Sequence, residues 1–163
     1  MELKRRFSFR KFFTIIYILS FLAYIGFYIV SPDGIAYMFD GGLLIPSIDL
    51  TSGVTKLELK NNRLDTPDSI VGSYARNTNK TLLIGHSSTV FKNLDQVNVN
   101  DIVTYNNTEY TVTNVETFKK SDIKMSNVLK AEEKDTLVLM TCAGTPVGDK
   151  DATHRLIVTA QAI

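Results

Sequence analysis

The chain from residue 43 onward is broken into short apolar segments, and this pattern constrains the fold more than any other feature. The segments are rich in Val, Ile, Leu, Thr and Tyr, and Asn, Asp, Gly and Ser separate them, which is typical of β-strands. We predict strands at 43–50, 56–59, 81–85, 102–105, 109–116, 136–142 and 155–163, a hairpin turn at 106–108, and one short helix or turn within 122–133. Many short strands at this spacing favour an all-β barrel or sandwich.

The N-terminal thirty residues differ in kind from the rest. Five basic residues lie within 1–11, and the next 19 residues, 12–30, carry no formal charge. A helix of that length reaches about 28 Å, close to the hydrocarbon thickness of a bilayer. A cleaved signal peptide is the alternative, but its apolar region is usually shorter and ends in small residues, whereas Tyr24 and Phe27 lie near this end. We expect a transmembrane helix at 12–30.

The distribution of charge predicts how the chain is oriented. The positive-inside rule places 1–11 in the cytoplasm as a basic tail and everything after the anchor outside it. Turn-forming residues make 31–42 a juxtamembrane linker, which leaves 43–163 as one domain of ordinary size. Beyond the anchor, 13 basic residues stand against 16 acidic ones, so the net charge is about minus three and nothing indicates nucleic-acid binding.

Cys142 is the only cysteine, and it lies where an apolar run meets a turn rich in Gly and Pro. One thiol cannot form an intrachain disulfide, so a packing role or a reactive role remains. Side chains alternate along a strand, and both alternating sets in 137–141 are largely apolar, so this strand should be central and covered on two faces. Such a strand is a rigid mount for a nucleophile at the edge of a sheet.

Two histidines and an arginine are the candidate partners of this thiol. His86 directly follows the predicted strand 81–85 and should lie at a sheet edge. His154 adjoins Arg155, and alternation sends the two side chains to opposite faces, so only one of them enters a shared groove. We favour Arg155 in the groove, His86 as the catalytic imidazole and a peripheral role for His154.

Each of these residues also has an ordinary structural explanation. A cysteine is often a small buried hydrophobe, a loop histidine is often satisfied by backbone, and an arginine often forms a surface ion pair. Their value lies in the combination. Two histidines and one cysteine are too few for a metal cluster of the usual spacing, so we expect no metal and no cofactor. We expect the Lys119-Lys120 pair and the charged run 130–135 to form solvated surface.

Three motifs carry a resemblance to a known family. The first is Ile84-Gly85-His86-Ser87-Ser88 with Phe91 and Leu94 downstream, the second runs from Val138 to Cys142, and the third is His154-Arg155-Leu156-Ile157-Val158. They resemble the sortases, which share a Gly-His segment with a following Phe-x-x-Leu, a Thr-Leu-x-Thr-Cys strand end and an arginine that opens the last strand. The order and approximate spacing agree, although Val138 stands where the first threonine is usual and no Pro-Gly pair precedes Gly85.

The resemblance implies a fold and a set of site residues. The fold would be an eight-stranded β-barrel with one or two short helices over about 43–163, preceded by the transmembrane helix. His86, Cys142 and Arg155 would occupy the catalytic positions. The segment between Asp68 and Thr81 has no carboxylate, unlike members that bind calcium beside the groove, so we predict no calcium requirement.

The resemblance also implies a reaction at the cell surface. Cys142 would attack the threonine carbonyl of a Leu-Pro-x-Thr-Gly-like C-terminal sorting signal on a secreted protein and form a thioester. An amine of a cell-wall precursor or another protein would then take the acyl group. His86 would carry the proton, and Arg155 would hold the substrate backbone or stabilise the oxyanion. A nearby cation would favour the attacking thiolate, since an ordinary cysteine has a pKa of about 8.5.

Two other functions remain open from the sequence. One is a cysteine endopeptidase that uses the same thioester but releases the surface protein to water. The other is a catalytically silent barrel that binds peptides in its groove, with Cys142 as a packing residue.

Overall fold

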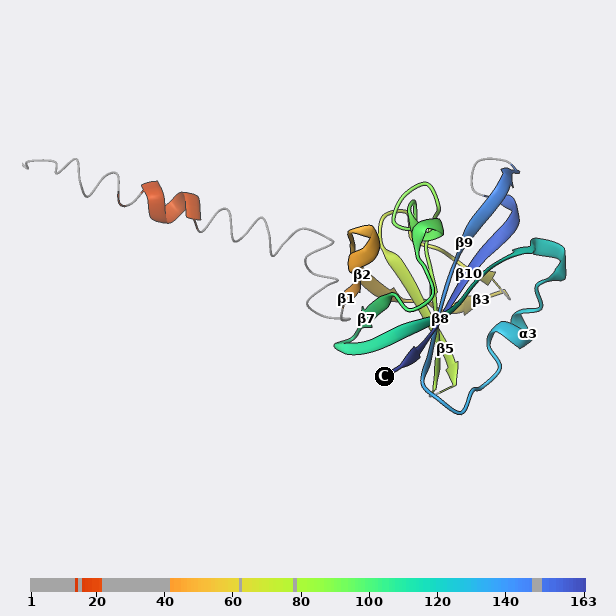
Figure 1. Ribbon diagram of the computed structural model, residues 1–163. Coiled ribbons are helices and arrows are strands. Elements are labelled where there is room, and N and C mark those ends of the chain that lie inside the picture. The colour runs from red at the N-terminus through yellow and green to blue at the C-terminus, as the bar shows by residue number, and fades with distance from the viewer. Residues whose placement is uncertain (1–13, 15, 22–41, 62, 78, 148–150) are drawn as a thin grey trace, which may run out of the picture.

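The structure, a computed structural model, describes residues 14, 16–21, 42–61, 63–77, 79–147 and 151–163. The elements are β1 (Gly42–Ile45), η1 (Pro46–Ile48), β2 (Leu50–Lys56), β3 (Leu59–Lys60), β4 (Arg63–Leu64), β5 (Val71–Asn77), β6 (Lys80–Ile84), η2 (Leu94–Gln96), β7 (Ile102–Tyr105), β8 (Thr108–Lys119), η3 (Lys120–Asp122), α3 (Met125–Val128), β9 (Thr136–Pro146) and β10 (Ala152–Ala162). Eight strands close a barrel in the order β1-β2-β5-β6-β9-β10-β8-β7 (Figure 1). The prediction of an all-β, eight-stranded barrel with few short helices is confirmed.

The predicted membrane anchor lies mostly outside the described residues. Residues 14 and 16–21 are helical. Within the part of the chain that the structure describes, no helix is long and apolar enough to cross a membrane. The tail 1–11 and nearly all of the linker 31–42 also fall outside the described residues.

Strand β9 separates two apolar layers. Its inward side chains, Leu137 and Leu139, are fully buried in the barrel core. Its outward side chains, Val138 and Met140, form a second cluster on the outside of the barrel with Leu82 of β6, and Leu64, Ile84, Val128, Leu129 and Ile157 pack against that cluster. The prediction that this strand is central and covered on both faces is therefore confirmed, because all residues from 136 to 141 are buried.

The predicted strands were wrong in three places. The segment 56–59 is not one strand, because Lys56 ends β2, residues 57 and 58 lie in no strand, and Leu59 begins β3. The segment 43–50 is not one strand, because Pro46 begins a 3-10 turn and Asp49 adopts a left-handed φ of 51°, so the chain reverses into β2. Strand β5 was missed because only Val71 among its first three residues is a large apolar side chain. A Cβ at Gly72 would lie 2.5 Å from a Leu57 methyl group, so the Leu57 side chain packs where a strand read by hydrophobic alternation would carry a side chain of its own.

The remaining strands agree with their predicted positions to within a few residues. The turn at 106–108 is a two-residue hairpin, in which Asn106 and Asn107 have positive φ of 49° and 63° and connect β7 to β8. In β10 the inward residues Leu156, Val158 and Ala160 are buried in the core, as alternation required.

The Tyr110 side chain should make the fold less stable at strongly alkaline pH. Burial first, and then the neighbouring Asp135 carboxylate that accepts its hydroxyl hydrogen bond at 3.2 Å, raise the pKa of Tyr110 to about 12. The unfolded tyrosine ionises near pH 10, so stability present below about pH 10 should be lost as the pH rises towards 12. We predict that Tyr110→Phe loses less stability than the wild type over this window, measured by urea unfolding. Parallel pH profiles would contradict this assignment.

Candidate active site

The register of β9 and β10 brings the candidate nucleophile and the candidate cation together. Cys142 on β9 and Arg155 on β10 are direct cross-strand partners in an antiparallel pair. The Cβ atoms of such partners lie about 5 Å apart and their side chains project from the same face of the sheet. That face is the outer one, because Leu156 beside Arg155 points into the core. The sequence-based choice of Arg155 over its neighbour for the groove therefore agrees with the geometry.

His86 is carried to the same place by the turn that follows β6. The amides of Thr89 and Phe91 donate to the His86 carbonyl at 3.2 and 3.0 Å, and Phe91 is buried at the end of this turn. Gly85 makes the arrangement possible, since a Cβ there would lie 2.7 Å from the Phe91 ring. The Thr141 hydroxyl donates to the Gly85 carbonyl at 2.8 Å, which ties the histidine segment to the residue before Cys142.

The imidazole of His86 has one ring nitrogen without a fixed partner. Its Nε2 is buried and makes no hydrogen bond to a described residue. The nearest carboxylate oxygen, Oδ1 of Asp68, lies 3.9 Å from it, which is beyond hydrogen-bond distance. The side chain as a whole is 18% exposed. A ring nitrogen that makes no hydrogen bond to a described residue can give or take a proton once a bound molecule comes within reach.

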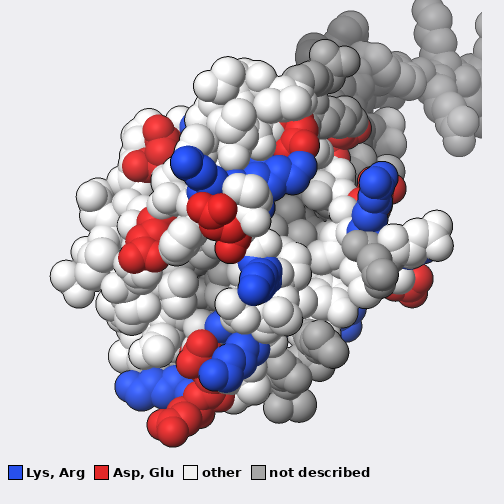
Figure 2. Space-filling view, turned by 90° about the vertical axis from the view of Figure 1, so that its right-hand side faces the viewer, with Lys and Arg blue, Asp and Glu red and all other residues white. Residues whose placement is uncertain are grey.

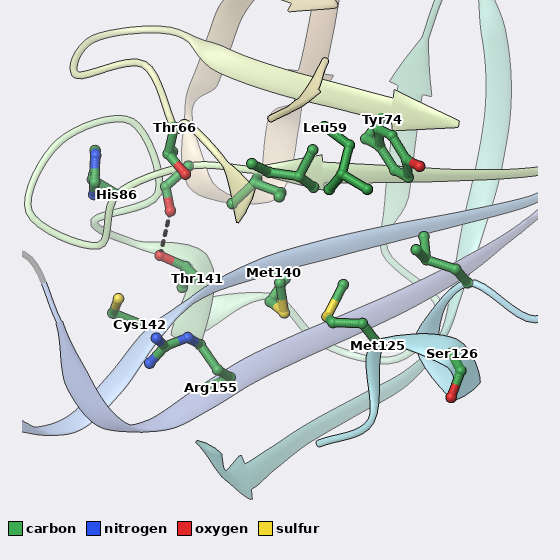
Figure 3. Close-up of a pocket in the computed structure, with 14 residues that line it drawn as sticks. Leu59, Thr66, Tyr74, His86, Met125, Ser126, Met140, Thr141, Cys142 and Arg155 are labelled. Carbon is green, nitrogen blue, oxygen red and sulfur yellow. Dashed lines mark hydrogen bonds between the residues drawn. The ribbon is translucent and has the colours of Figure 1, made fainter. Parts of the chain in front are cut away.

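The three candidate residues line one cleft of about 680 Å³. Figure 3 shows His86, Cys142 and Arg155 at one end, with Met140, Met125 and the side chain of Leu59 extending away from them. The other lining residues are Leu64, Thr66, Tyr74, Ile84, Gly85, Ser126, Leu129 and Thr141. The cleft is therefore an elongated, mainly apolar groove with polar and titratable groups gathered at one end.

Two elements form the walls of this groove: the small sheet β3–β4, which was not predicted, and α3, which lies within the short helix or turn predicted at 122–133. The two-stranded sheet β3–β4 supplies Leu59 and Leu64, and α3 with the residue after it supplies Met125, Ser126 and Leu129. Asn61 lies in the turn between β3 and β4 with a left-handed φ of 50°, a conformation that Asn tolerates, so this residue is a local sequence signal for the turn.

On the face that Figure 2 shows, basic and acidic side chains are interspersed rather than segregated.

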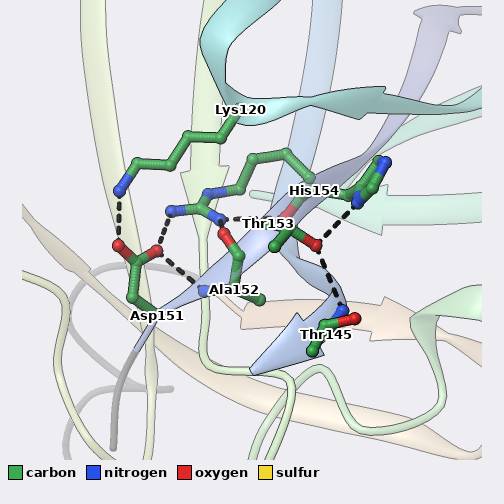
Figure 4. Close-up of polar contacts among 7 residues, drawn as sticks. Lys120, Thr145, Asp151, Ala152, Thr153 and His154 are labelled. Carbon is green, nitrogen blue, oxygen red and sulfur yellow. Dashed lines mark hydrogen bonds and ion pairs between the residues drawn. The ribbon is translucent and has the colours of Figure 1, made fainter. Parts of the chain in front are cut away.

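Arg155 is held by several contacts at the start of β10. Its Nη1 donates to the carbonyls of Ala152 and His154 at 3.0 and 2.9 Å, and its Nη2 donates to Oδ1 of Asp151 at 2.6 Å. The other carboxylate oxygen of Asp151 accepts a hydrogen bond from Lys120 (Figure 4). Hydrogen bonds from Lys120 and then Arg155 hold the pKa of Asp151 well below its usual range.

Sequence reasoning missed Asp151. Lys120 and Glu132 are exposed, as expected of solvated surface, and each also forms an ion pair: Lys120 with Asp151, and Glu132 with the buried Lys80 at 3.0 Å. His154 does not line the cleft, and its Nδ1 lies 2.8 Å from the Thr153 hydroxyl. Among the described residues, no group of three or more His, Cys, Asp and Glu side chains is placed to hold a metal ion.

Comparison with known proteins identifies the class of this barrel. Sortase A of Listeria monocytogenes is similar over 75% of this chain and 85% of its own, with a TM-score of 0.57 and 20% identity. Sortase C-1 of Actinomyces oris is 25% identical, covering 75% of this chain and 70% of its own, with a TM-score of 0.54. A Clostridium perfringens sortase C, whose structure includes the C-terminal cell wall sorting motif, is 19% identical over 76% of this chain and 70% of its own, with a TM-score of 0.57.

The family follows from the sequence as well. No curated protein matches the chain. The fold is that of sortases of the A and C classes. The family model of the sortase domain matches residues 43–163, and the chain therefore belongs to the sortase family. Its subclass is not distinguished, because sortases of both the A and C classes are similar to it.

Thr141→Val tests the link between the strand end and the histidine segment. The variant keeps the side-chain shape but removes the donor to the buried Gly85 carbonyl. We predict a fall of about 1–2 kcal/mol in the free energy of unfolding, the cost of an unsatisfied buried acceptor. Thr117→Val, at an exposed threonine near the end of β8, is the matched control and should change stability by less than about 0.5 kcal/mol. Equal effects of the two substitutions would show that the link contributes nothing.

Proposed function

We propose that the chain is a membrane-anchored cysteine transpeptidase that cleaves a Leu-Pro-x-Thr-Gly-like signal between Thr and Gly and transfers the acyl group to an amine. The observation that carries the proposal is the convergence of His86, Cys142 and Arg155 at one end of an apolar groove. Membership of the sortase family supports the reaction class.

The first half of the reaction forms a thioester. The thiolate of Cys142 attacks the threonine carbonyl carbon, and the resulting oxyanion is stabilised by the guanidinium of Arg155. Protonated His86 gives its proton to the leaving glycine amine as the Thr–Gly bond breaks. The second half reverses these roles: an acceptor amine attacks the thioester, neutral His86 takes its proton, and the Cys142 thiolate leaves. One amide bond is exchanged for another, so no net hydrolysis occurs.

The shape and polarity of the groove support a peptide as the substrate. Apolar side chains, including Leu59, Met125 and Met140, line the part of the groove that leads away from Cys142. Such a surface suits the leucine and proline that precede the threonine in a sorting signal. That a related Clostridium perfringens enzyme has been determined with a cell wall sorting motif supports the same class of substrate here. The acceptor would be an amine of a cell-wall precursor or a lysine of another surface protein.

If the three side chains catalyse the reaction, their substitution should lower the activity to different extents. With a Leu-Pro-x-Thr-Gly peptide, Cys142→Ala should form no acyl adduct detectable by mass spectrometry. His86→Ala and Arg155→Ala should each lower kcat/KM at least about 100-fold, the usual cost of losing a general acid or an oxyanion donor. His154→Ala is the matched histidine control, because that side chain lies outside the groove.

The outcomes separate the candidate functions. Full turnover by Cys142→Ala would reject the nucleophile. Adding an amine should replace the hydrolysed product with the amide product, and a hydrolysed product at every amine concentration would indicate an endopeptidase. A folded wild type that forms no adduct with any member of a sorting-signal peptide library would favour the silent peptide-binding barrel.

The proposed location rests on the basic tail 1–11, the uncharged run 12–30 and the linker 31–42. They would make the protein a single-pass membrane protein whose domain 43–163 lies outside the cytoplasm. Because Cys142 is the only cysteine, a membrane-impermeant maleimide should label the wild type in intact cells and should not label Cys142→Ala. Labelling only after the cells are broken, read by mass, would place the domain in the cytoplasm.

A further inference from the structure

We propose that Asp151 is a positioning residue for Arg155, and that Lys120 holds Asp151 in place. The inference rests on the proposed function for the reaction that Arg155 serves. It adds two residues that do not line the groove but determine how the guanidinium faces it.

The first argument is an account of the donors of Arg155. A guanidinium has five N–H donors in a fixed planar fork. The bonds to the carbonyls of Ala152 and His154 and to Asp151 use three of them, two on Nη1 and one on Nη2. The other two, one on Nη2 and one on Nε, make no hydrogen bond to a described residue. Because the Nη1 bonds and the Asp151 bond fix both ends of the fork, the plane of the guanidinium is set before any substrate arrives.

The carboxylate of Asp151 is itself fixed at both oxygens. Oδ1 accepts from Arg155 and, at 2.8 Å, from the amide of Ala152, while Oδ2 accepts from Lys120 (Figure 4). Hydrogen bonds from Lys120 and Arg155 keep the pKa of this carboxyl low, so the cluster stays ionised through neutral and mildly acidic pH and is lost only as the pH falls through that low pKa. Two cations sharing one carboxylate leave one net positive charge beside the groove. The clamp therefore orients Arg155 without removing the positive potential that a developing oxyanion needs.

Lys120 connects this clamp to a wall of the groove. It opens η3, at the start of the connection from β8 to β9. The same connection carries Met125, Ser126 and Leu129, which line the groove. The Asp151 carboxylate thus joins the start of β10 to the segment that forms one side of the groove. Because it contacts both Arg155 and Lys120, it holds the guanidinium in a fixed position relative to that wall.

The kinetic test uses the full chain and a Leu-Pro-x-Thr-Gly peptide. Asp151→Ala should lower kcat about 10-fold and leave KM within about 2-fold, because a misplaced guanidinium weakens transition-state binding more than ground-state binding. Asp151→Asn, which keeps the size and an acceptor oxygen but not the charge, should lose less. Asp122→Asn, a neighbouring carboxylate in η3 that accepts from Ser121 and not from Arg155, is the matched control and should retain wild-type kinetics.

A double-mutant cycle separates positioning from a general structural role. If Asp151 acts through Arg155, then Asp151→Ala in an Arg155→Ala background should cost less than about 2-fold further. A further 10-fold loss in that background would overturn the proposal. Asp151→Asn serves in the same cycle if Asp151→Ala fails to fold.

A spectroscopic readout makes the proposal independent of activity. In protein with 15N-labelled arginine, the Arg155 Nη signals should be resolved in the wild type, because the clamp hinders rotation, and should average in Asp151→Ala. Unchanged signals would overturn the proposal, even if the enzyme is active. Averaged signals in a chain that processes no sorting-signal peptide would support the clamp and reject the proposed function instead.

Discussion

The antiparallel pairing of β9 with β10 is the constraint on which the site depends. Its register places Cys142 opposite Arg155, and the burial of residues 136–141 holds that register because a shift by one residue would turn the apolar side chains of both layers to the wrong faces. The thiol and the guanidinium are therefore adjacent as a consequence of strand pairing. Their backbone positions depend on the strand pair, while the contacts of Asp151 set the orientation of the guanidinium.

The histidine reaches the same place by a different route. His86 lies outside the regular strands, on a turn closed by two backbone hydrogen bonds and anchored by the burial of Phe91. Gly85 gives the Phe91 ring its room, and the Thr141 hydroxyl fastens the turn to β9. The spacing from Gly85 to Leu94 that resembles a sortase motif thus has a physical explanation here, since Phe91 and Leu94 are both core residues.

The parts of the fold that could be predicted from sequence are those set by short-range alternation. Strand β9, the two faces of β10 and the Asn106-Asn107 hairpin follow from apolar periodicity and turn chemistry. Strand β5 did not, because its place in the sheet comes from contact of Gly72 with Leu57 and from parallel pairing with β2. The site divides in the same way. Cys142, His86 and Arg155 could be identified from sequence because they lie in recognisable motifs. The contact between Lys120 and Asp151 joins residues 31 apart that no periodic pattern relates.

The outer apolar cluster has a consequence for how this protein can diversify. Leu64, Ile84, Leu129 and Met140 belong both to that cluster and to the lining of the groove. The side chains that a peptide would touch are thus also the ones that pack over β6 and β9. Evolution of a new specificity by enlarging this groove would create voids in the packing, so altered recognition and loss of stability would arrive together unless compensating substitutions came first.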